Sequence, residues 1–190
     1  MTEEEKTEIE NCAGVLRAGG VILYPTDTLW GLGCDATNEA AVQKIFTLKK
    51  RSGAKSMIVL LDSENRLESY VREVPEQAYT LIEFADKPLS IIYDGARNLA
   101  NSVVADDGSI GIRIVKDPFC RRLIERFRKP IVSTSANISG QEPPATFADI
   151  DAQIRNGVDY VVNLRHQEKS KQASSIIRLR KNGTIEIIRK

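Results

Sequence analysis

Four cationic side chains lie within the seven residues 49–55, which read Lys-Lys-Arg-Ser-Gly-Ala-Lys. An apolar helical pattern precedes this cationic loop, and an apolar run from Met57 to Leu61 follows it. Arginine binds phosphate or carboxylate as a planar fork, and lysine binds either one as a point charge. We therefore interpret the loop as an anion-binding site. The alternative is a solvent-exposed helix end, where cations complement the helix dipole.

Two polar clusters follow predicted strands in a similar way. The sequence Thr-Asp-Thr at 26–28 comes shortly after the apolar run 21–24, and the run that begins at Ile131 leads into the hydroxyl-rich segment 133–140. In open α/β sheets, ligands bind beyond the carboxyl ends of strands. Each cluster alone is equally consistent with ordinary Ser, Thr and Asn turns. Together with the cationic loop, the two clusters favour a single pocket.

Arg113 stands in an apolar strand pattern formed by Ile110, Ile112 and Ile114. Period two places Arg113 on the opposite face of that strand, beside Gly111, whose missing side chain would leave room for a small ligand. A half-buried arginine needs an anionic partner, either a protein carboxylate or a ligand. An outward-facing strand position is the alternative.

Composition limits the classes of function. The chain has 190 residues, 42% hydrophobic and 28% charged, as in ordinary globular proteins. Its net charge of +1 argues against wholesale nucleic-acid wrapping but allows a local basic patch. We expect no membrane span. Because the three cysteines are far apart and form no C-x-x-C motif, neither a zinc site nor a disulfide framework is indicated, and we predict a cytoplasmic protein.

Other catalytic motifs fit poorly. The segment 31–36 matches G-x-G-x-x-A, but a long polar turn separates it from the preceding strand, which argues against a dinucleotide site. The segment 52–55 matches S-x-x-K without its companion motifs. The sole histidine, His166, lies in a polar stretch, so a Ser-His-Asp triad is not expected.

The hydrophobic pattern predicts an α/β fold with a mixed sheet and helices on at least one face. We expect a polar turn over 25–33, a mobile polar loop over 165–172, and a C-terminal hairpin around Asn182-Gly183. Predicted helices cover 2–18, 38–48, 63–71, 75–84 and 117–128, with another after Thr146. Predicted strands cover 21–24, 57–61, 89–93, 110–115, 160–164, 175–180 and 184–189, with another starting at Ile131.

Three motifs resemble the YrdC family. They are Tyr-Pro-Thr-Asp-Thr at 24–28 with Gly-Leu-Gly at 31–33, Lys50-Arg51-x-x-x-Lys55, and Ser-Ala-Asn-Ile-Ser-Gly at 135–140. The resemblance spans about Gly19 to Arg189. It implies a single twisted, open mixed sheet with helices packed on it and a concave ligand-binding face. It also implies one domain over 1–190, without the additional C-terminal domain of a longer branch.

The resemblance further implies an L-threonylcarbamoyladenylate synthase. Such an enzyme converts L-threonine, bicarbonate and ATP, with Mg²⁺, into threonylcarbamoyl-AMP and pyrophosphate. A partner transferase then passes the threonylcarbamoyl group to a tRNA adenosine. The alternative is a non-enzymatic module that binds tRNA or double-stranded RNA on its concave face.

Site residues follow from the same resemblance, and no metal-ligating side chain is among them. Residues implied to contact threonine or the carbamate are Thr26, Thr28, Arg113, Ser133 and Ser175. Residues implied to contact ATP are Lys50, Arg51, Lys55, Ser135, Asn137 and Arg189, of which Lys50, Arg51 and Lys55 would be catalytic.

We predict that Lys55→Ala lowers adenylate formation by about tenfold or more, since removing one charge contact typically costs about 2–4 kcal/mol of transition-state stabilisation. Pyrophosphate release by the purified variant measures this, and circular dichroism checks that the fold is retained. Turnover close to that of the wild type would assign the loop to a solvent-exposed helix end.

Overall fold

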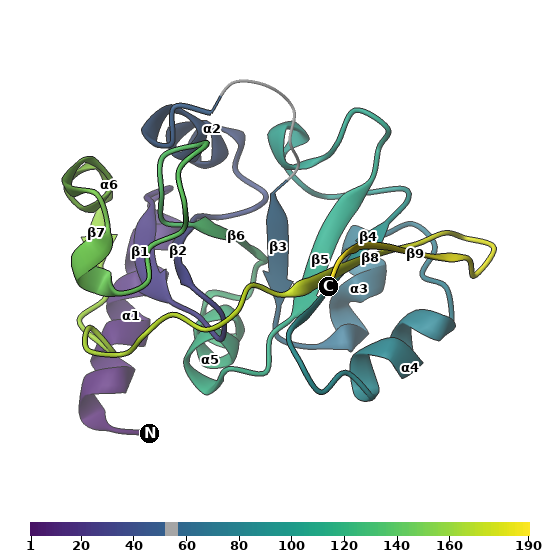
Figure 1. Ribbon diagram of the computed structural model, residues 1–190, viewed down its shortest axis with the longest axis horizontal. Helices are drawn as coiled ribbons and strands as arrows, with labels where there is room; N and C mark the ends of the chain where they lie inside the picture. The colour runs from purple at the N-terminus through teal and green to yellow at the C-terminus, as the bar shows by residue number, and fades with distance from the viewer. Residues whose placement is uncertain (52–56) are drawn as a thin grey trace.

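The computed structural model describes residues 1–51 and 57–190 (Figure 1). The described strands are β1 Ile22–Pro25, β2 Trp30–Gly33, β3 Ile58–Leu61, β4 Leu89–Tyr93, β5 Ile110–Ile114, β6 Ile131–Ser135, β7 Tyr160–Val161, β8 Ser175–Leu179 and β9 Ile185–Arg189. The described α-helices are α1 Glu3–Arg17, α2 Glu39–Leu48, α3 Leu67–Tyr70, α4 Gln77–Glu83, α5 Pro118–Phe127 and α6 Ala152–Gly157. Three short 3₁₀ turns are η1 Glu64–Arg66, η2 Asn101–Val103 and η3 Phe147–Asp149.

The strands form one open mixed sheet in the order β7-β1-β2-β6-β3-β5-β4-β8-β9. Neighbouring strands β1 and β2, β2 and β6, and β3 and β6 are antiparallel, whereas β3 and β5 are parallel. Because β7 and β9 each pair on one side only, the sheet does not close into a barrel. The predicted α/β class with a single mixed sheet is confirmed.

Helices cover both faces of the sheet, as the period-two alternation of the strands requires. Ile22 and Leu60 pack with α1 and α5 on one face. Leu23 and Val59, their sequence neighbours, pack with α2, α3 and α4 on the other face. In Figure 1, α1 and α5 lie side by side near the N-terminal strands, while α3 and α4 lie below β4, β8 and β9.

Local capping confirms the helix starts that depend on short polar signals. The Thr2 side chain accepts from the Glu5 backbone and the Glu5 side chain accepts from the Thr2 backbone, which completes the predicted capping box. Asn38 caps α2, and Asp117 followed by Pro118 starts α5. In the described part of the chain, no helix is long and apolar enough to cross a bilayer.

The prediction of a polar turn over 25–33 is wrong for its second half, because Trp30–Gly33 is the buried strand β2. The turn itself is shorter. The Thr26 hydroxyl holds it by accepting hydrogen bonds from the backbone nitrogens of Thr28 and Leu29. Gly33 is required by packing: a Cβ there would lie 2.7 Å from the Tyr24 ring. A glycine can therefore indicate that another group packs closely against a strand, and it does not always indicate a turn.

Three further predicted elements are shorter than expected. The strand over 160–164 pairs only at Tyr160–Val161, and the helix over 63–71 divides into η1 and α3. Thr146 does form a capping box with Asp149, but the box starts a 3₁₀ turn, and α6 has its own cap at Asp151.

The polar segment 165–172 packs against the sheet end. Its Lys171 backbone nitrogen donates to the Thr28 carbonyl at 2.7 Å, and the Ser170 nitrogen donates to Ala145 at 2.7 Å. The His166 ring stacks on Phe147 with centroids 3.8 Å apart. These contacts place the segment next to the β1–β2 turn.

We predict that Gly33→Ala destabilises the protein by about 1–3 kcal/mol, because the added methyl group must displace the buried Tyr24 ring or the neighbouring backbone. The matched control is Gly14→Ala in α1, where an added Cβ meets no atom within 4 Å. That variant should be more stable by about 0.5–1 kcal/mol. Urea denaturation measures both, and equal effects would contradict the packing account.

Candidate functional site

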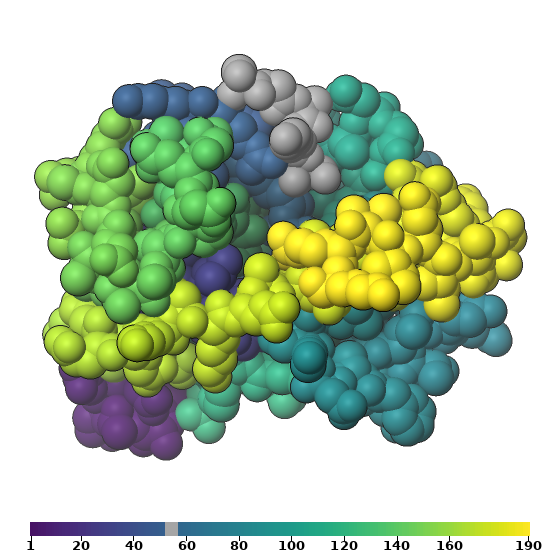
Figure 2. Space-filling view, in the orientation of Figure 1, coloured from purple at the N-terminus to yellow at the C-terminus, as the bar shows by residue number. Residues whose placement is uncertain are grey.

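The strand register brings the predicted polar clusters together. Gly31 on β2 lies opposite Ser135 on β6, and Ile58 at the start of β3 lies opposite Ser133. A cavity of about 230 Å³ opens at this point. Figure 2 shows the hollow between the green segment after β6 and the yellow C-terminal hairpin, with the dark purple β1–β2 region at its floor. We call it the hydroxyl cavity; the predicted residues that line it are Thr26, Thr28, Arg51, Arg113, Ser133, Ser135 and Arg189.

Arg113 is the buried charge of this cavity, with 5% of its surface exposed. Its Nη2 lies 3.0 Å from Asp27 Oδ1, and its Nη1 donates to the Thr28 hydroxyl at 3.4 Å. Its Nε has no hydrogen-bond acceptor among the residues that the structure describes. Burial raises the pKa of the Asp27 carboxyl, and the Arg113 charge opposes that rise. The guanidinium therefore has donor capacity left for a second anion.

The predicted room above Gly111 is absent. A Cβ built at Gly111 would lie 2.6 Å from the Ile58 side chain, which fills the space on that face of β5. The prediction that Arg113 faces a cavity is nevertheless confirmed, because both Ile58 and Arg113 line the hydroxyl cavity. The ligand space lies beside Ile58.

The hydroxyls of the two threonines in the β1–β2 turn make different hydrogen bonds. The Thr26 hydroxyl holds the turn: it donates to the Leu29 carbonyl at 2.8 Å and accepts from two backbone nitrogens. The Thr28 hydroxyl lies 3.0 Å from the Thr26 hydroxyl and accepts from Arg113. Thr28 is therefore the residue that links the turn to the buried cation.

A second cavity of about 430 Å³ adjoins the first and shares Arg51, Thr134 and Ser135 with it. Lys50 and Asn137 line this second cavity, which we call the cationic cavity. Lys50 is exposed, with a left-handed backbone at φ 50°. The third predicted cation, Lys55, lies outside the described residues.

Lys49 belongs to the predicted cationic loop, but it was not among the site residues that the family resemblance implied. It also lines the cationic cavity, yet only 2% of its surface is exposed. Its Nζ donates to the carbonyls of Ser135 at 2.5 Å and Asn137 at 2.6 Å, which ties the end of α2 to the end of β6. The helical spacing could have found it, because Lys49 follows Ile45 by four residues on the buried face of α2.

Asn137 and Arg189 are held by backbone groups. The Asn137 amide nitrogen donates to the carbonyls of Ile138 and Gln141 at 2.9 and 2.8 Å, and its buried Oδ1 accepts from no donor among the described residues. Arg189 donates to the Ser174 carbonyl through Nε at 3.0 Å and Nη2 at 2.7 Å. Ser174 lines the hydroxyl cavity, whereas the predicted Ser175 lines neither cavity.

Comparisons with known proteins agree with this geometry. The model of the Sua5_yciO_yrdC family, whose description reads "Telomere recombination", matches residues 14–190. The chain belongs to the Sua5/YciO/YrdC family. A threonylcarbamoyl-AMP synthase of Vibrio parahaemolyticus is 33% identical over 93% of the chain and 96% of its own length. A relative from Methanocaldococcus jannaschii is 34% identical over 97% of the chain and 86% of its own length.

A solved Sua5/YciO/YrdC structure shows the same fold. Sua5 of P. abyssi, crystallised in complex with L-threonine, aligns with a TM-score of 0.82 and 26% identity. The alignment covers 94% of the present chain but only 52% of that protein, so the chain spans about half of its length. The resemblance to the YrdC family and the open sheet that it implied are thereby confirmed.

Lys49 gives the cationic cavity a pH dependence. Burial, with the nearby Arg51 charge as a second cause, lowers the pKa of Lys49 to about 8. The ammonium is therefore charged at neutral pH and loses its proton as the pH rises through that value. Sulfate is a useful probe, because its own charge is constant in this range. We predict that its dissociation constant rises about tenfold between about pH 7 and pH 9, as expected for the loss of one charge contact.

NMR titration of sulfate at each pH measures this effect. Lys49→Met should bind sulfate weakly and without pH dependence, whereas Lys50→Met, at the exposed neighbour, should keep the pH dependence of the wild type. The same pH dependence in Lys49→Met as in the wild type would show that another group titrates.

Proposed function

We propose that the protein is an L-threonylcarbamoyladenylate synthase, a nucleotidyltransferase that uses L-threonine, bicarbonate and ATP. The observation that carries this proposal is the buried Arg113 in a hydroxyl-lined cavity that adjoins a cationic one. The first cavity suits a small hydroxylated amino acid, and the second suits a polyphosphate. The names of the relatives, and the L-threonine bound to P. abyssi Sua5, support the same assignment.

In this proposal the threonine carboxylate binds Arg113. The guanidinium contacts Asp27 through Nη2 and Thr28 through Nη1, and its remaining N–H groups would offer a carboxylate charge-assisted hydrogen bonds. The hydroxyls of Thr28 and Ser133 line the same cavity and would hold the hydroxyl and amine of the substrate. Thr26 acts by fixing the turn.

ATP then occupies the cationic cavity. Lys49, Lys50 and Arg51 offset the phosphate charge, and Ser135 and Asn137 lie on the same wall. Arg189 would contact the nucleotide from the hydroxyl cavity. Lys55 keeps its predicted catalytic role. Ser175 would act only through its neighbour Ser174, which lines the cavity.

The chemistry needs positioning more than a protein nucleophile. The threonine amine and bicarbonate form an N-carboxy species, with loss of water. An oxygen of the new carbamate group attacks the α-phosphorus of ATP. The bond between the α-phosphorus and the oxygen that bridges to the β-phosphate breaks, and pyrophosphate leaves with the electron pair. Cations that face the phosphates stabilise the developing negative charge.

Mg²⁺ is expected to arrive on the phosphates of ATP. No group of three or more His, Cys, Asp or Glu side chains in the described residues could hold a metal ion. Phosphate oxygens and waters are the ligands that Mg²⁺ commonly uses in nucleotide sites. We therefore assign no catalytic step to a protein-held metal ion.

The product would pass to a tRNA-modifying transferase, and the cytoplasm is the compartment in which these substrates meet. The alternative of a non-enzymatic module for tRNA or double-stranded RNA is not favoured. The relatives are named as synthases, and the net charge of +1 offers little general attraction to a polyanion.

The deciding experiment is pyrophosphate release from ATP by the purified protein. We expect release only when L-threonine and bicarbonate are both present, because the attacking oxygen exists only after they combine. Bicarbonate-free buffer and L-serine in place of L-threonine are the controls. Release without threonine, or none with all three substrates, would contradict the proposed reaction.

We predict that Arg113→Lys raises the KM for L-threonine about tenfold or more, because an ammonium cannot reproduce the planar fork of the guanidinium. The KM for ATP should change less than about twofold. The control is Arg178→Lys on β8, whose guanidinium pairs with Asp94 and Asp107 away from both cavities. Equal effects on both substrates would remove Arg113 from the threonine site.

A further inference from the structure

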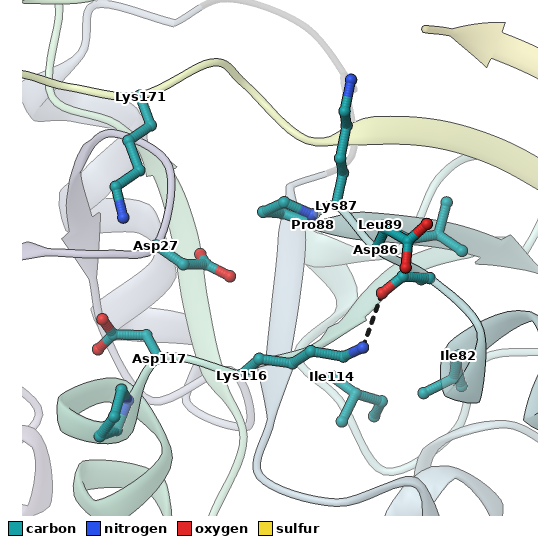
Figure 3. A pocket seen from close by; sticks show the side chains of 12 residues that line it. Asp27, Ile82, Asp86, Lys87, Pro88, Leu89, Ile114, Lys116, Asp117 and Lys171 are labelled. Carbon is teal, nitrogen blue, oxygen red and sulfur yellow. Dashed lines mark hydrogen bonds between the residues drawn. The ribbon is translucent and has the colours of Figure 1, made fainter.

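A third cavity, of about 340 Å³, is lined by Asp27 but by no residue that lines the hydroxyl cavity. It lies between the β1–β2 turn, the start of α5 and the loop before β4 (Figure 3). Asp27 lies between this third cavity and Arg113: its Oδ1 pairs with Arg113, and its side chain also lines the third cavity. Its volume is at the lower end of the range of small-molecule sites, about 300–1,000 Å³.

The charges around the third cavity balance. Three carboxylates and three ammonium groups line it, so neither a simple anion nor a simple cation finds a uniformly attractive wall. Some of these groups already have partners. Asp117 accepts from Arg165 at 2.6 Å and caps α5, and Lys116 donates to the Ala85 carbonyl at 2.7 Å.

Of the other four charges, Asp27 pairs with Arg113 through Oδ1 and Lys171 is the ammonium next to Asp27, whereas Asp86 and Lys87 lie on the far side of the cavity in Figure 3. The Lys171 backbone is anchored to the Thr28 carbonyl, and its side chain extends toward Asp27 in Figure 3. Burial raises the pKa of Asp27, and the Arg113 charge and, to a smaller extent, the Lys171 charge oppose that rise. No hydrogen bond joins Asp27 and Lys171 within the described residues, so a ligand could bridge the two charges.

The opposite wall carries an apolar patch of Ile82, Leu89 and Ile114, which Figure 3 shows across the cavity from Asp27 and Asp117, with the Asp86 carboxylate and the Lys116 ammonium beside it. A ligand that matches both walls carries one positive group, one negative group and a short aliphatic body. Free α-amino acids with aliphatic side chains have this chemistry.

We propose that the third cavity binds a free aliphatic α-amino acid of the leucine type. The ligand ammonium binds Asp27, the ligand carboxylate binds Lys171, and the side chain lies against Ile82, Leu89 and Ile114. The site is distinct from the proposed threonine site, because no described residue lines both cavities. It therefore does not depend on the proposed function.

Methyl groups provide the test. Leu89 reports the third cavity and Ile58 and Ile176 report the hydroxyl cavity, whereas Ile82 and Ile114 line the third cavity and also a neighbouring cavity of about 810 Å³. Methyl NMR of the full chain is recorded during titration with L-leucine to about 10 mM, a range that detects millimolar binding. We expect saturable shifts at Leu89, accompanied by Ile82 and Ile114, with Ile58 and Ile176 unchanged.

Two analogues and two variants complete the design. N-acetyl-L-leucine lacks the ammonium and 3-methylbutylamine lacks the carboxylate, so each should bind about tenfold more weakly or worse. Lys171→Ala should weaken L-leucine binding to a similar extent. Phe84→Ala is the matched control and should bind as the wild type does, because Phe84 is 73% exposed at the end of α4 and does not line the cavity.

Three results would overturn the proposal. They are the absence of saturable shifts at Leu89, equal binding of L-leucine and both analogues, and shifts at Ile58 and Ile176 alone. The last result would mean that L-leucine enters the hydroxyl cavity instead. A thermal melt of Lys171→Ala confirms that this variant is folded before its affinity is interpreted.

Discussion

The buried ion pair between Arg113 and Asp27 is the constraint around which the site is built. Removing a charge from water costs several kcal/mol even after the structure relaxes, and this cost offsets much of the attraction between the two charges. A pair at this depth is therefore weak evidence that the ion pair stabilises the fold. Its two members come from β5 and from the β1–β2 turn, which are far apart in the sequence. The fold therefore holds a guanidinium in a hydroxyl-lined cavity with part of its donor capacity unused. Such an arrangement suits binding of a second anion better than it suits folding.

Lys49 performs a related task at the neighbouring cavity. By donating to the carbonyls of Ser135, the last residue of β6, and of Asn137, it ties the end of α2 to the hydroxyl-rich segment. Arg51 and Ser135 border both cavities, so a ligand in one lies next to a ligand in the other. Condensation of two bound substrates requires this adjacency, because positioning supplies much of the rate when no protein nucleophile takes part.

Much of the fold could be predicted from local sequence signals. The capping box at Thr2, the Asp117-Pro118 helix start and the hairpin at Asn182-Gly183 all depend on residues close in sequence, and all are present. Strand β2 could not be predicted in the same way, because its glycines resemble a turn. Gly33 is needed for close packing against Tyr24, which the sequence alone does not reveal.

The site could be predicted only in part. Strand-end polarity placed Thr28 and Ser133 at one cavity correctly, and the period-two pattern over 110–114 placed Arg113 there. The space beside Gly111 could not be judged, because its occupant, Ile58, comes from another strand. The family resemblance implied Lys50 and not Lys49, although Lys49, the C-cap of α2, follows the buried Ile45 by four residues.

The central claim is that Arg113 binds the carboxylate of L-threonine. Calorimetric titration of L-threonine and L-threoninamide, which lacks that carboxylate, against the wild type and Arg113→Gln tests it most directly. The account predicts that the wild type prefers L-threonine by about tenfold or more, and that Arg113→Gln loses this preference. An equal preference in both proteins would contradict the claim, since the carboxylate would then be bound by another group.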